Sequence, residues 1–159
     1  MHKPSFVYTT YIRTTAEELW QALTDPGFTE RYWGMRLESD WQVGSNLSFV
    51  HHGLAVEDDE QVVLEADPPH RLAYTWHTFT RSWADSWGVS EEFRAKAATE
   101  PRSKVSFVIE QADDFVKLTV VHDGFEPGSA VLESISGGWP KVISSLKTML
   151  ETGTVVAAA

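Results

Sequence analysis

The feature that most constrains the fold of this chain is an apolar stripe near its C-terminus, at the spacing of a helix face. Its members recur every three or four residues and are Val131, Leu132, Ile135, Trp139, Val142, Ile143, Leu146 and Leu150. Such a stripe predicts an amphipathic helix that buries one face against another layer of structure. Because Gly137, Gly138 and Pro140 interrupt the pattern, we expect this helix either to kink or to restart with Pro140 in its first turn.

Segments of alternating apolar and polar residues precede the stripe and predict strands of an antiparallel sheet. A first strand is expected near the N-terminus, rich in aromatic and β-branched residues, and the others follow in the second and third quarters of the chain. These strands are residues 6–12, 47–52, 61–66, 71–78, 103–110 and 116–122. The turns at 67–69 and 112–114 contain Pro or Asp, and we expect the acidic run 57–60 to form a hairpin tip.

Two short helices are expected between the first and second strands. Thr15 and Glu18 match a capping box, and an apolar helical face runs from there to the stop at residues 25–27. A second short helix follows over 28–33. The order of elements predicts an α+β fold, with a curved antiparallel sheet of about six strands wrapped around the long C-terminal helix.

Residues 79–101 are too long for an ordinary structureless loop, so they are expected to form a helical insertion or a lid. Trp83 and Trp87 lie four residues apart and would share one helix face, while Ser90 is placed to cap a further helical turn. The alternative is a surface insertion whose tryptophans pack on the outside of the sheet.

Composition excludes several classes of partner and site. The formal net charge of −10 opposes binding to a phosphate backbone, so no nucleic acid partner is expected. The absence of cysteine removes thiolate chemistry and is consistent with a reducing compartment. We expect a cytoplasmic protein with no membrane partner, because no stretch approaches about 18 apolar residues. The length predicts one domain over 1–159, with a core from 5 to 152.

Several segments in order resemble a known family. Residues 15–26 are similar to its opening helix, 67–76 to its mid-sheet turn and strand, and Gly138-Trp139-Pro140 with Leu146 and Leu150 to its terminal helix. The family is that of the homologues of the activator of heat-shock-protein-ninety ATPase, within the START-like (SRPBCC) superfamily. The resemblance implies a helix-grip fold with a cavity between sheet and helix that receives lipids, polyketides or other apolar molecules. It also implies a possible heat-shock chaperone partner and a role in stress responses.

The candidate ligand-binding residues are those that the strand and helix patterns place toward this cavity. They are Trp33, Phe49, His51, Leu72, Tyr74, Trp76, Phe107, Leu118, Val120, His122, Trp139 and Ile143. Each is also a plausible packing residue, and for the two histidines local hydrogen-bond partners are the expected arrangement.

No catalytic residue, metal site or cofactor is predicted from the sequence. His51 and His52 are adjacent on an expected strand and would face opposite sides of the sheet, which argues against joint metal ligation. Signatures of serine hydrolases, phosphate-binding loops and zinc hydrolases are absent from the sequence. Binding of a small apolar molecule is therefore the leading hypothesis. A cyclase, aromatase or hydrolase that uses Tyr74 with His51 or His122 is the second, and a chaperone-associated interaction module is the third.

Overall fold

The main layer of the structure is a five-stranded antiparallel sheet in the order β1-β8-β7-β6-β5. The computed structural model describes residues 3–155. The strands of the sheet are β1 (Phe6–Ile12), β5 (Val63–Asp67), β6 (Arg71–Thr75), β7 (Lys104–Ala112) and β8 (Phe115–Asp123). The first strand of the chain thus pairs with the last, and the expected hairpin of β7 and β8 turns at Asp113 and Asp114.

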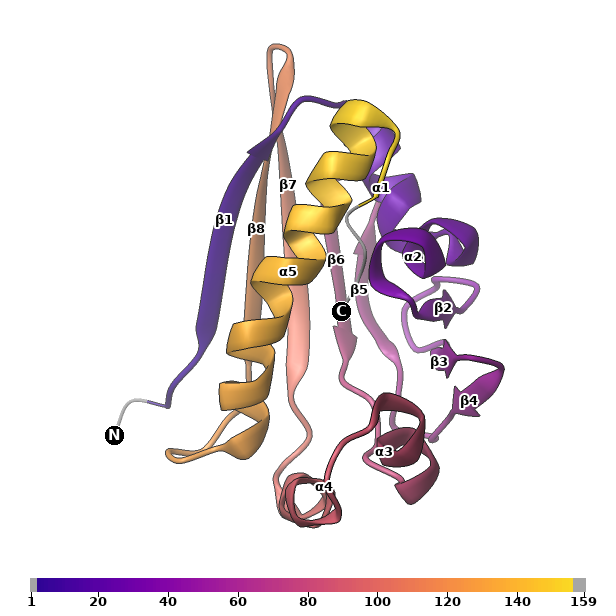
Figure 1. Cartoon of the computed structure of the whole chain (residues 1–159). Helices are drawn as coiled ribbons and strands as arrows, with labels where there is room; N and C mark the ends of the chain where they lie inside the picture. The colour runs from indigo at the N-terminus through magenta and orange to yellow at the C-terminus, as the bar shows by residue number, and fades with distance from the viewer. Residues whose placement is uncertain (1–2, 156–159) are drawn as a thin grey trace.

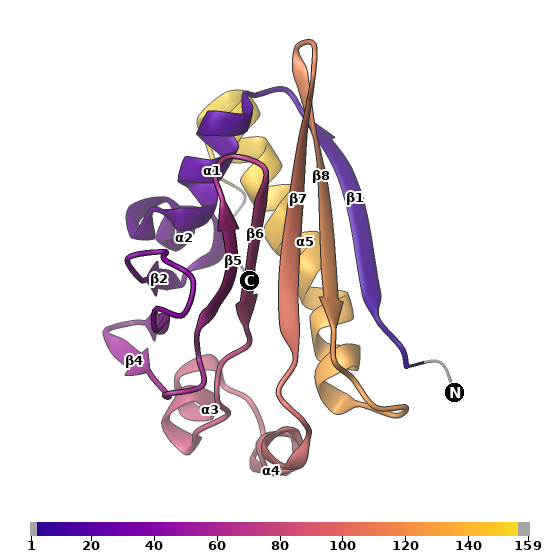
Figure 2. The same ribbon diagram turned by 180° about the vertical axis from the view of Figure 1, so that it is seen from behind.

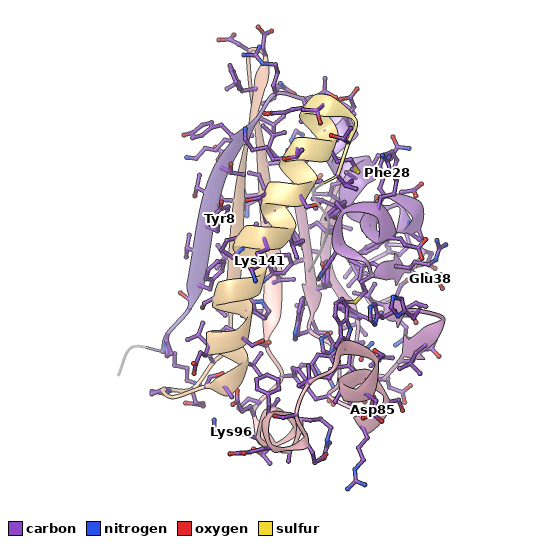
Figure 3. All side chains as sticks on the ribbon, viewed as in Figure 1. Tyr8, Phe28, Glu38, Asp85, Lys96 and Lys141 are labelled. Carbon is purple, nitrogen blue, oxygen red and sulfur yellow. The ribbon has the colours of Figure 1, made fainter. Side chains whose placement is uncertain are left out.

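The C-terminal helix α5 (Ala130–Thr152) lies diagonally across one face of this sheet (Figure 1). Its buried side chains include Ile135, Trp139, Ile143 and Leu146, which belong to the predicted stripe, whereas Lys141 projects from its outer side (Figure 3). In the view from behind, no helix of the described chain covers the opposite face of the sheet (Figure 2). The α+β class and the helix-grip arrangement are therefore confirmed.

Pro140 lies inside α5, and the helix does not restart there. A proline in a helix interior costs roughly 3 kcal/mol or more, because one hydrogen bond is lost and the ring crowds the preceding turn. Large apolar side chains contribute about 1.5–3 kcal/mol each when they are buried. Since α5 buries such side chains on both sides of Pro140, from Val131 to Met149, packing offsets the cost of the proline.

A second, three-stranded sheet contains β2 (Arg36–Glu38), β3 (Ser48–His51) and β4 (Leu54–Val56). The strand predicted at 47–52 is β3 and belongs to this small sheet instead of the main one. The β3–β4 hairpin turns at His52 and Gly53, which have φ of 49° and 78°. The acidic run 57–60 instead connects β4 with β5, so its assignment as a hairpin tip is wrong. The alternation assigns His52 to the strand, whereas the chain turns there because Gly53 adopts a positive φ at no steric cost.

Helices α1 (Ala16–Thr24) and α2 (Pro26–Trp33) follow β1, as predicted. The hydroxyl of Thr15 accepts a hydrogen bond from the Glu18 backbone N–H at 3.1 Å, which caps α1. The carboxylate of Asp25 accepts hydrogen bonds from the first N–H groups of α2. These caps fix α2 at the sheet side on which α5 also lies, and the two helices are in contact.

Residues 79–101 form a helical insertion made of α3 (Arg81–Trp87) and α4 (Glu91–Thr99). Thr80 and Ser90 cap these helices by accepting hydrogen bonds from the N–H groups of Trp83 and Phe93. Asp85 on α3 and Lys96 on α4 mark the insertion at one end of the molecule (Figure 3). Helix α3 contacts β4 and α4 contacts α5, so the insertion bridges the small sheet and the C-terminal helix. Among the helices of residues 3–155, none is long and apolar enough to cross a membrane.

Candidate functional site

Three tryptophans from distant parts of the sequence meet where α2, the end of β6 and α5 converge. The ring centroids of Trp33 and Trp76 are 6.1 Å apart, those of Trp33 and Trp139 5.3 Å, and those of Trp76 and Trp139 5.6 Å. The sequence patterns predicted that all three lie near one site, and the structure brings them together. The resulting surface is broad, aromatic and nearly buried.

Two adjoining hollows open beside this cluster: the larger lies between α5 and the helical insertion, and the smaller lies along α5 beside Trp33 and Trp76. One has a volume of about 150 Å³ and the other of about 110 Å³. Both are lined by Trp33, Trp76, Ser134 and Ile135, and we call the pair the aromatic groove. Its remaining lining residues are Met35, His77, Phe79, Trp83, Trp87, Phe93, Val131, Gly138, Trp139 and Val142.

Helix α3 is held against the small sheet by His51. The ring of His51 stacks on Trp87 at 3.7 Å between centroids with an interplanar angle of 9°. Its Nδ1 lies 3.0 Å from Ser86 Oγ, whose own hydrogen is donated to the Trp83 carbonyl. His51 Nδ1–H is therefore the donor to Ser86. Burial, aided by the neighbouring His52, lowers the pKa of His51. His51 thus fixes the helix that carries two of the groove's tryptophans.

His52 stacks on the other side of His51, at 4.0 Å and 20°. The expectation that the two rings face opposite sides of a sheet is wrong, because His52 lies in the turn with φ of 49° and not in the strand. Within the described part of the chain, no group of three or more His, Asp or Glu residues is placed to hold a metal ion.

His122 connects the main sheet to α5 through a buried hydrogen-bonded chain. The Trp139 indole N–H donates a hydrogen bond to His122 Nδ1 at 3.0 Å. Because Nδ1 accepts, the proton of the neutral His122 ring is on Nε2, which lies 2.9 Å from Ser103 Oγ. Burial lowers the pKa of His122 to about 3. Both ring nitrogens are engaged, which is the structural arrangement expected for this histidine.

Most of the other predicted site residues form a packed core behind the groove. They are not among the residues that line the two hollows, and each is at most 2% exposed. They are Phe49, Leu72, Tyr74, Phe107, Leu118, Val120 and Ile143. The aromatic rings of Phe49 and Phe107 contact Trp76 and Trp139, so this core supports the groove wall. Burial raises the pKa of Tyr74 well above its usual value.

His77, Phe79 and Phe93 are groove residues that the sequence patterns did not select. Trp76 continues the alternation of Leu72 and Tyr74, whereas His77, which alternation directs to the other face, is also buried because β6 ends at Thr75. Burial lowers the pKa of His77 to about 4, and the ring is neutral at pH 7. The i,i+4 spacing of Trp83 and Trp87 indicates that the two rings share one helix face, and in the structure both line the larger hollow.

The indole nitrogens of Trp83 and Trp87 lack hydrogen-bond partners. Each Nε1 is shielded from solvent and meets no acceptor among residues 3–155. An indole N–H is a donor that buried tryptophans in proteins usually satisfy. Two unsatisfied donors on α3 are therefore unusual, and because neither nitrogen is accessible to solvent, they do not face the open hollow.

The comparisons with known proteins agree with this architecture. The family model of the activator of Hsp90 ATPase homolog 1-like proteins matches residues 13–151. The chain belongs to this family. A search of curated proteins found no match.

Solved structures with the same fold include several bacterial proteins. Protein MLL2253 from Mesorhizobium loti has a TM-score of 0.71 and 23% identity, over 92% of this chain and 96% of that one. The Aha1 dimer from Colwellia psychrerythraea has a TM-score of 0.68 and 18% identity, over 94% and 98%. CalU16 from Micromonospora echinospora has a TM-score of 0.63 and 20% identity, over 91% and 73%. At these identities the similarity shows the fold.

Proposed function

We propose that this chain binds a small apolar molecule in the aromatic groove. The observation that carries the proposal is the groove itself, a partly open space whose lining is mostly aromatic and aliphatic. Binding sites for small molecules are typically concave and apolar with a few placed polar groups. Trp33, Trp76 and Trp139 would contact the ligand, and the core behind them would hold these rings in place.

The remaining predicted site residues enter this proposal as supports of the groove. Phe49, Leu72, Tyr74, Phe107, Leu118, Val120 and Ile143 would keep the aromatic wall rigid, His122 would fix the ring of Trp139, and His51 would fix α3. A rigid wall reduces the ordering cost of binding, because fewer side chains lose freedom when the ligand enters.

The groups that a catalytic mechanism would need are poorly suited to proton transfer near neutral pH. His122 has both ring nitrogens engaged and a pKa of about 3, and the pKa of Tyr74 is raised by burial. A general acid or base works best when its pKa is near the working pH. These properties support binding over catalysis for Tyr74 and His122, and His51 is engaged by Ser86 and Trp87.

The proposal places the protein in the cytoplasm, in keeping with a chain that has no cysteine. A role in stress responses is part of the same hypothesis and depends on which ligand is bound. The proposal does not extend to a heat-shock chaperone partner, because the similarity to the Aha1 dimer structure speaks for the fold.

The test uses N-phenyl-1-naphthylamine, a neutral fluorophore whose two ring systems suit the two adjoining hollows. We expect saturable enhancement of its emission on titration with the protein. Ser134 is exposed on α5 at the rim of both hollows, so Ser134→Trp should block the groove and weaken binding by about tenfold or more. Ser144→Trp is the matched control, because Ser144 is exposed on the same helix and does not belong to the groove lining.

The control variant should bind the probe as the wild type does, and both variants should melt within a few degrees of it. An absence of saturable emission with the wild type would contradict the proposal. Equal binding by the wild type and the Ser134→Trp protein would also contradict it, since the probe would then bind elsewhere.

A further inference from the structure

His77 is a buried polar side chain of the groove lining whose hydrogen-bonding capacity is only half used. The residue is 3% exposed, and its ring centroid lies 4.8 Å from those of Phe79 and Trp83. All three residues line the larger hollow of the groove. A polar atom of His77 without a partner therefore bears on what the groove accepts.

The position of the His77 proton follows from the hydrogen bond that the ring makes within residues 3–155. Nδ1 lies 3.0 Å from the carbonyl oxygen of Thr78, and a carbonyl can only accept, so Nδ1 carries the proton. Burial lowers the pKa of His77 to about 4, so the ring is neutral at pH 7. Nε2 is therefore an unprotonated nitrogen that can accept a hydrogen bond but cannot donate one.

Nε2 has no partner among the described residues and, in contrast to the indole nitrogens of Trp83 and Trp87, it is not sealed from solvent. Because the rest of the side chain is buried, Nε2 meets solvent in a hollow that His77 lines. Two hollows qualify, namely the larger one of the groove and a third one of about 220 Å³ lined by Thr78, Ala98 and others.

The direction of the His77 ring favours the groove as the hollow that Nε2 faces. The two nitrogens of an imidazole ring point away from each other, and Nδ1 points at the carbonyl of Thr78. Thr78 belongs to the lining of the third hollow and not to that of the groove. Nε2, on the side of the ring away from Thr78, is thus directed toward the groove.

A ligand that enters the groove displaces the solvent next to Nε2. Affinity is lost when a water is displaced by a group that does not replace its hydrogen bond. A hydrocarbon would leave Nε2 unpaired, and so would a ketone or an ether, since neither carries a donor. An O–H or N–H group on the ligand supplies the missing partner.

The lining of the larger hollow also selects against charge. Within the described residues, it contains no Asp, Glu, Lys or Arg. An ammonium or carboxylate group would lose its hydration there without meeting an opposite charge, which is strongly unfavourable. The donor that pairs with Nε2 is therefore expected on an uncharged molecule.

We infer that the ligand is an uncharged apolar molecule with an O–H or N–H group that donates a hydrogen bond to His77 Nε2, an inference that rests on the proposed function. Phenols, apolar alcohols, anilines and indoles fit this description. The larger hollow has a volume of about 150 Å³, and an apolar cavity of about that size can hold a benzene ring.

Three small aromatic probes separate the possibilities. Phenol carries a neutral donor, toluene replaces the hydroxyl by a methyl group of similar size, and benzylamine carries a charged donor at pH 7. Affinities are measured by titration in ¹H–¹⁵N correlation spectra. We expect phenol to bind at least tenfold more tightly than benzylamine. In long-range ¹H–¹⁵N spectra of the six histidine rings, phenol should move the Nε2 signal of His77 upfield, and toluene should not.

His77→Phe removes the acceptor and keeps an aromatic ring in the groove wall. The dissociation constant for phenol should rise about tenfold relative to that for toluene, as the loss of one hydrogen bond predicts. The ratio of the two constants is the readout, because a change of ring shape affects both ligands. Phe79→Leu is the control, since it alters the same lining without removing a polar side-chain atom and should leave the ratio unchanged.

Two further variants decide which hollow the phenol occupies. Ser134→Trp blocks the groove and should weaken phenol binding about tenfold or more. Ala98 is exposed on α4 and lines the third hollow but not the groove, so Ala98→Trp should leave phenol binding unchanged. The opposite pattern would overturn the inference, because the donor would then lie in the third hollow.

The other outcomes are equally definite. An unchanged ratio in His77→Phe, or benzylamine binding as tight as that of phenol, would overturn the inference. If N-phenyl-1-naphthylamine binds in the groove and phenol leaves the Nε2 signal of His77 in place, the inference fails and the proposed function stands. If none of the probes binds the wild type, both fail. The Nε2 shift in the wild type remains decisive even where His77→Phe folds poorly.

Discussion

Two buried histidines make the stability of this protein depend on pH in a range where most proteins are little affected. Burial lowers the pKa of His77 to about 4 and that of His122 to about 3. The two side chains are 3% and 0% exposed, so neither ring can be protonated without transfer of a charge into the core. In the unfolded chain both rings titrate near pH 6.5.

The sign of the effect follows from where each state binds its protons. Below about pH 6.5 the unfolded chain takes up a proton at each histidine, whereas the folded chain does so only near pH 4 and pH 3. Stability is therefore complete above pH 6.5 and falls as the pH is lowered toward those values. Between pH 7 and pH 5 each histidine should cost roughly 2 kcal/mol, or about 3–4 kcal/mol together, out of a typical total of 5–15 kcal/mol.

Carboxylates act in a lower range. The pKa of Glu100 is lowered by its hydrogen bonds with Ser129 and Ala130, despite the opposing effect of burial, and that of Glu151 is lowered mainly by its hydrogen bond with Lys147. Their stabilisation is present above the carboxylate pKa of the unfolded chain, about 4.3, and is lost below it. The decline between pH 6.5 and pH 5 is therefore specific to the histidines.

The assay is urea unfolding followed by tryptophan fluorescence at pH 7, 6 and 5. Near pH 5.5 the free energy of unfolding should change by roughly 2 kcal/mol per pH unit, and His122→Asn should about halve that slope whatever it does to stability at pH 7. His70→Asn, at an exposed turn position, should leave the slope unchanged. A free energy of unfolding that stays constant from pH 7 to pH 5, or a full slope in His122→Asn, would refute the reasoning.

Two further substitutions test how the groove is held. His51→Ala removes the stacking on Trp87 and the hydrogen bond to Ser86. Amide exchange in α3 should therefore accelerate about tenfold or more, while the protection of α5 is unchanged. Hydrogen-exchange mass spectrometry measures both. Gln61→Leu removes the hydrogen bonds of the buried Gln61 side chain with the carbonyls of Leu47 and Val56 and with the N–H of Thr78. The free energy of unfolding should fall by roughly 3 kcal/mol or more, with the exposed Gln42→Leu as the control. A loss below about 1 kcal/mol in urea unfolding would contradict this expectation.

The elements that the sequence predicts well are those in which one face is buried over many residues. The stripe of α5 and the alternation of β7 and β8 each repeat at least three times, so that a few exceptions do not hide the period. The caps at Thr15 and Ser90 are local hydrogen bonds and depend on adjacent residues alone. The small sheet was only partly predicted, because β2 and β4 have three residues each and show too little of a pattern.

The groove was less predictable than the core for a physical reason. Alternation predicts that a side chain is buried, but it does not tell whether the neighbouring layer fills the space above it. Phe49, Leu72 and Phe107 follow the pattern and are covered completely. Trp76 and His77 lie beyond the end of β6, where consecutive residues no longer alternate, and it is there that space remains.

The space beside Trp76 is set by side chains from three separate parts of the chain. Trp33 comes from α2, Trp83 and Trp87 from the insertion, and Ile135 from α5. The groove therefore forms only where α2, the insertion and α5 meet around Trp76, an arrangement that no pattern within a single element can indicate.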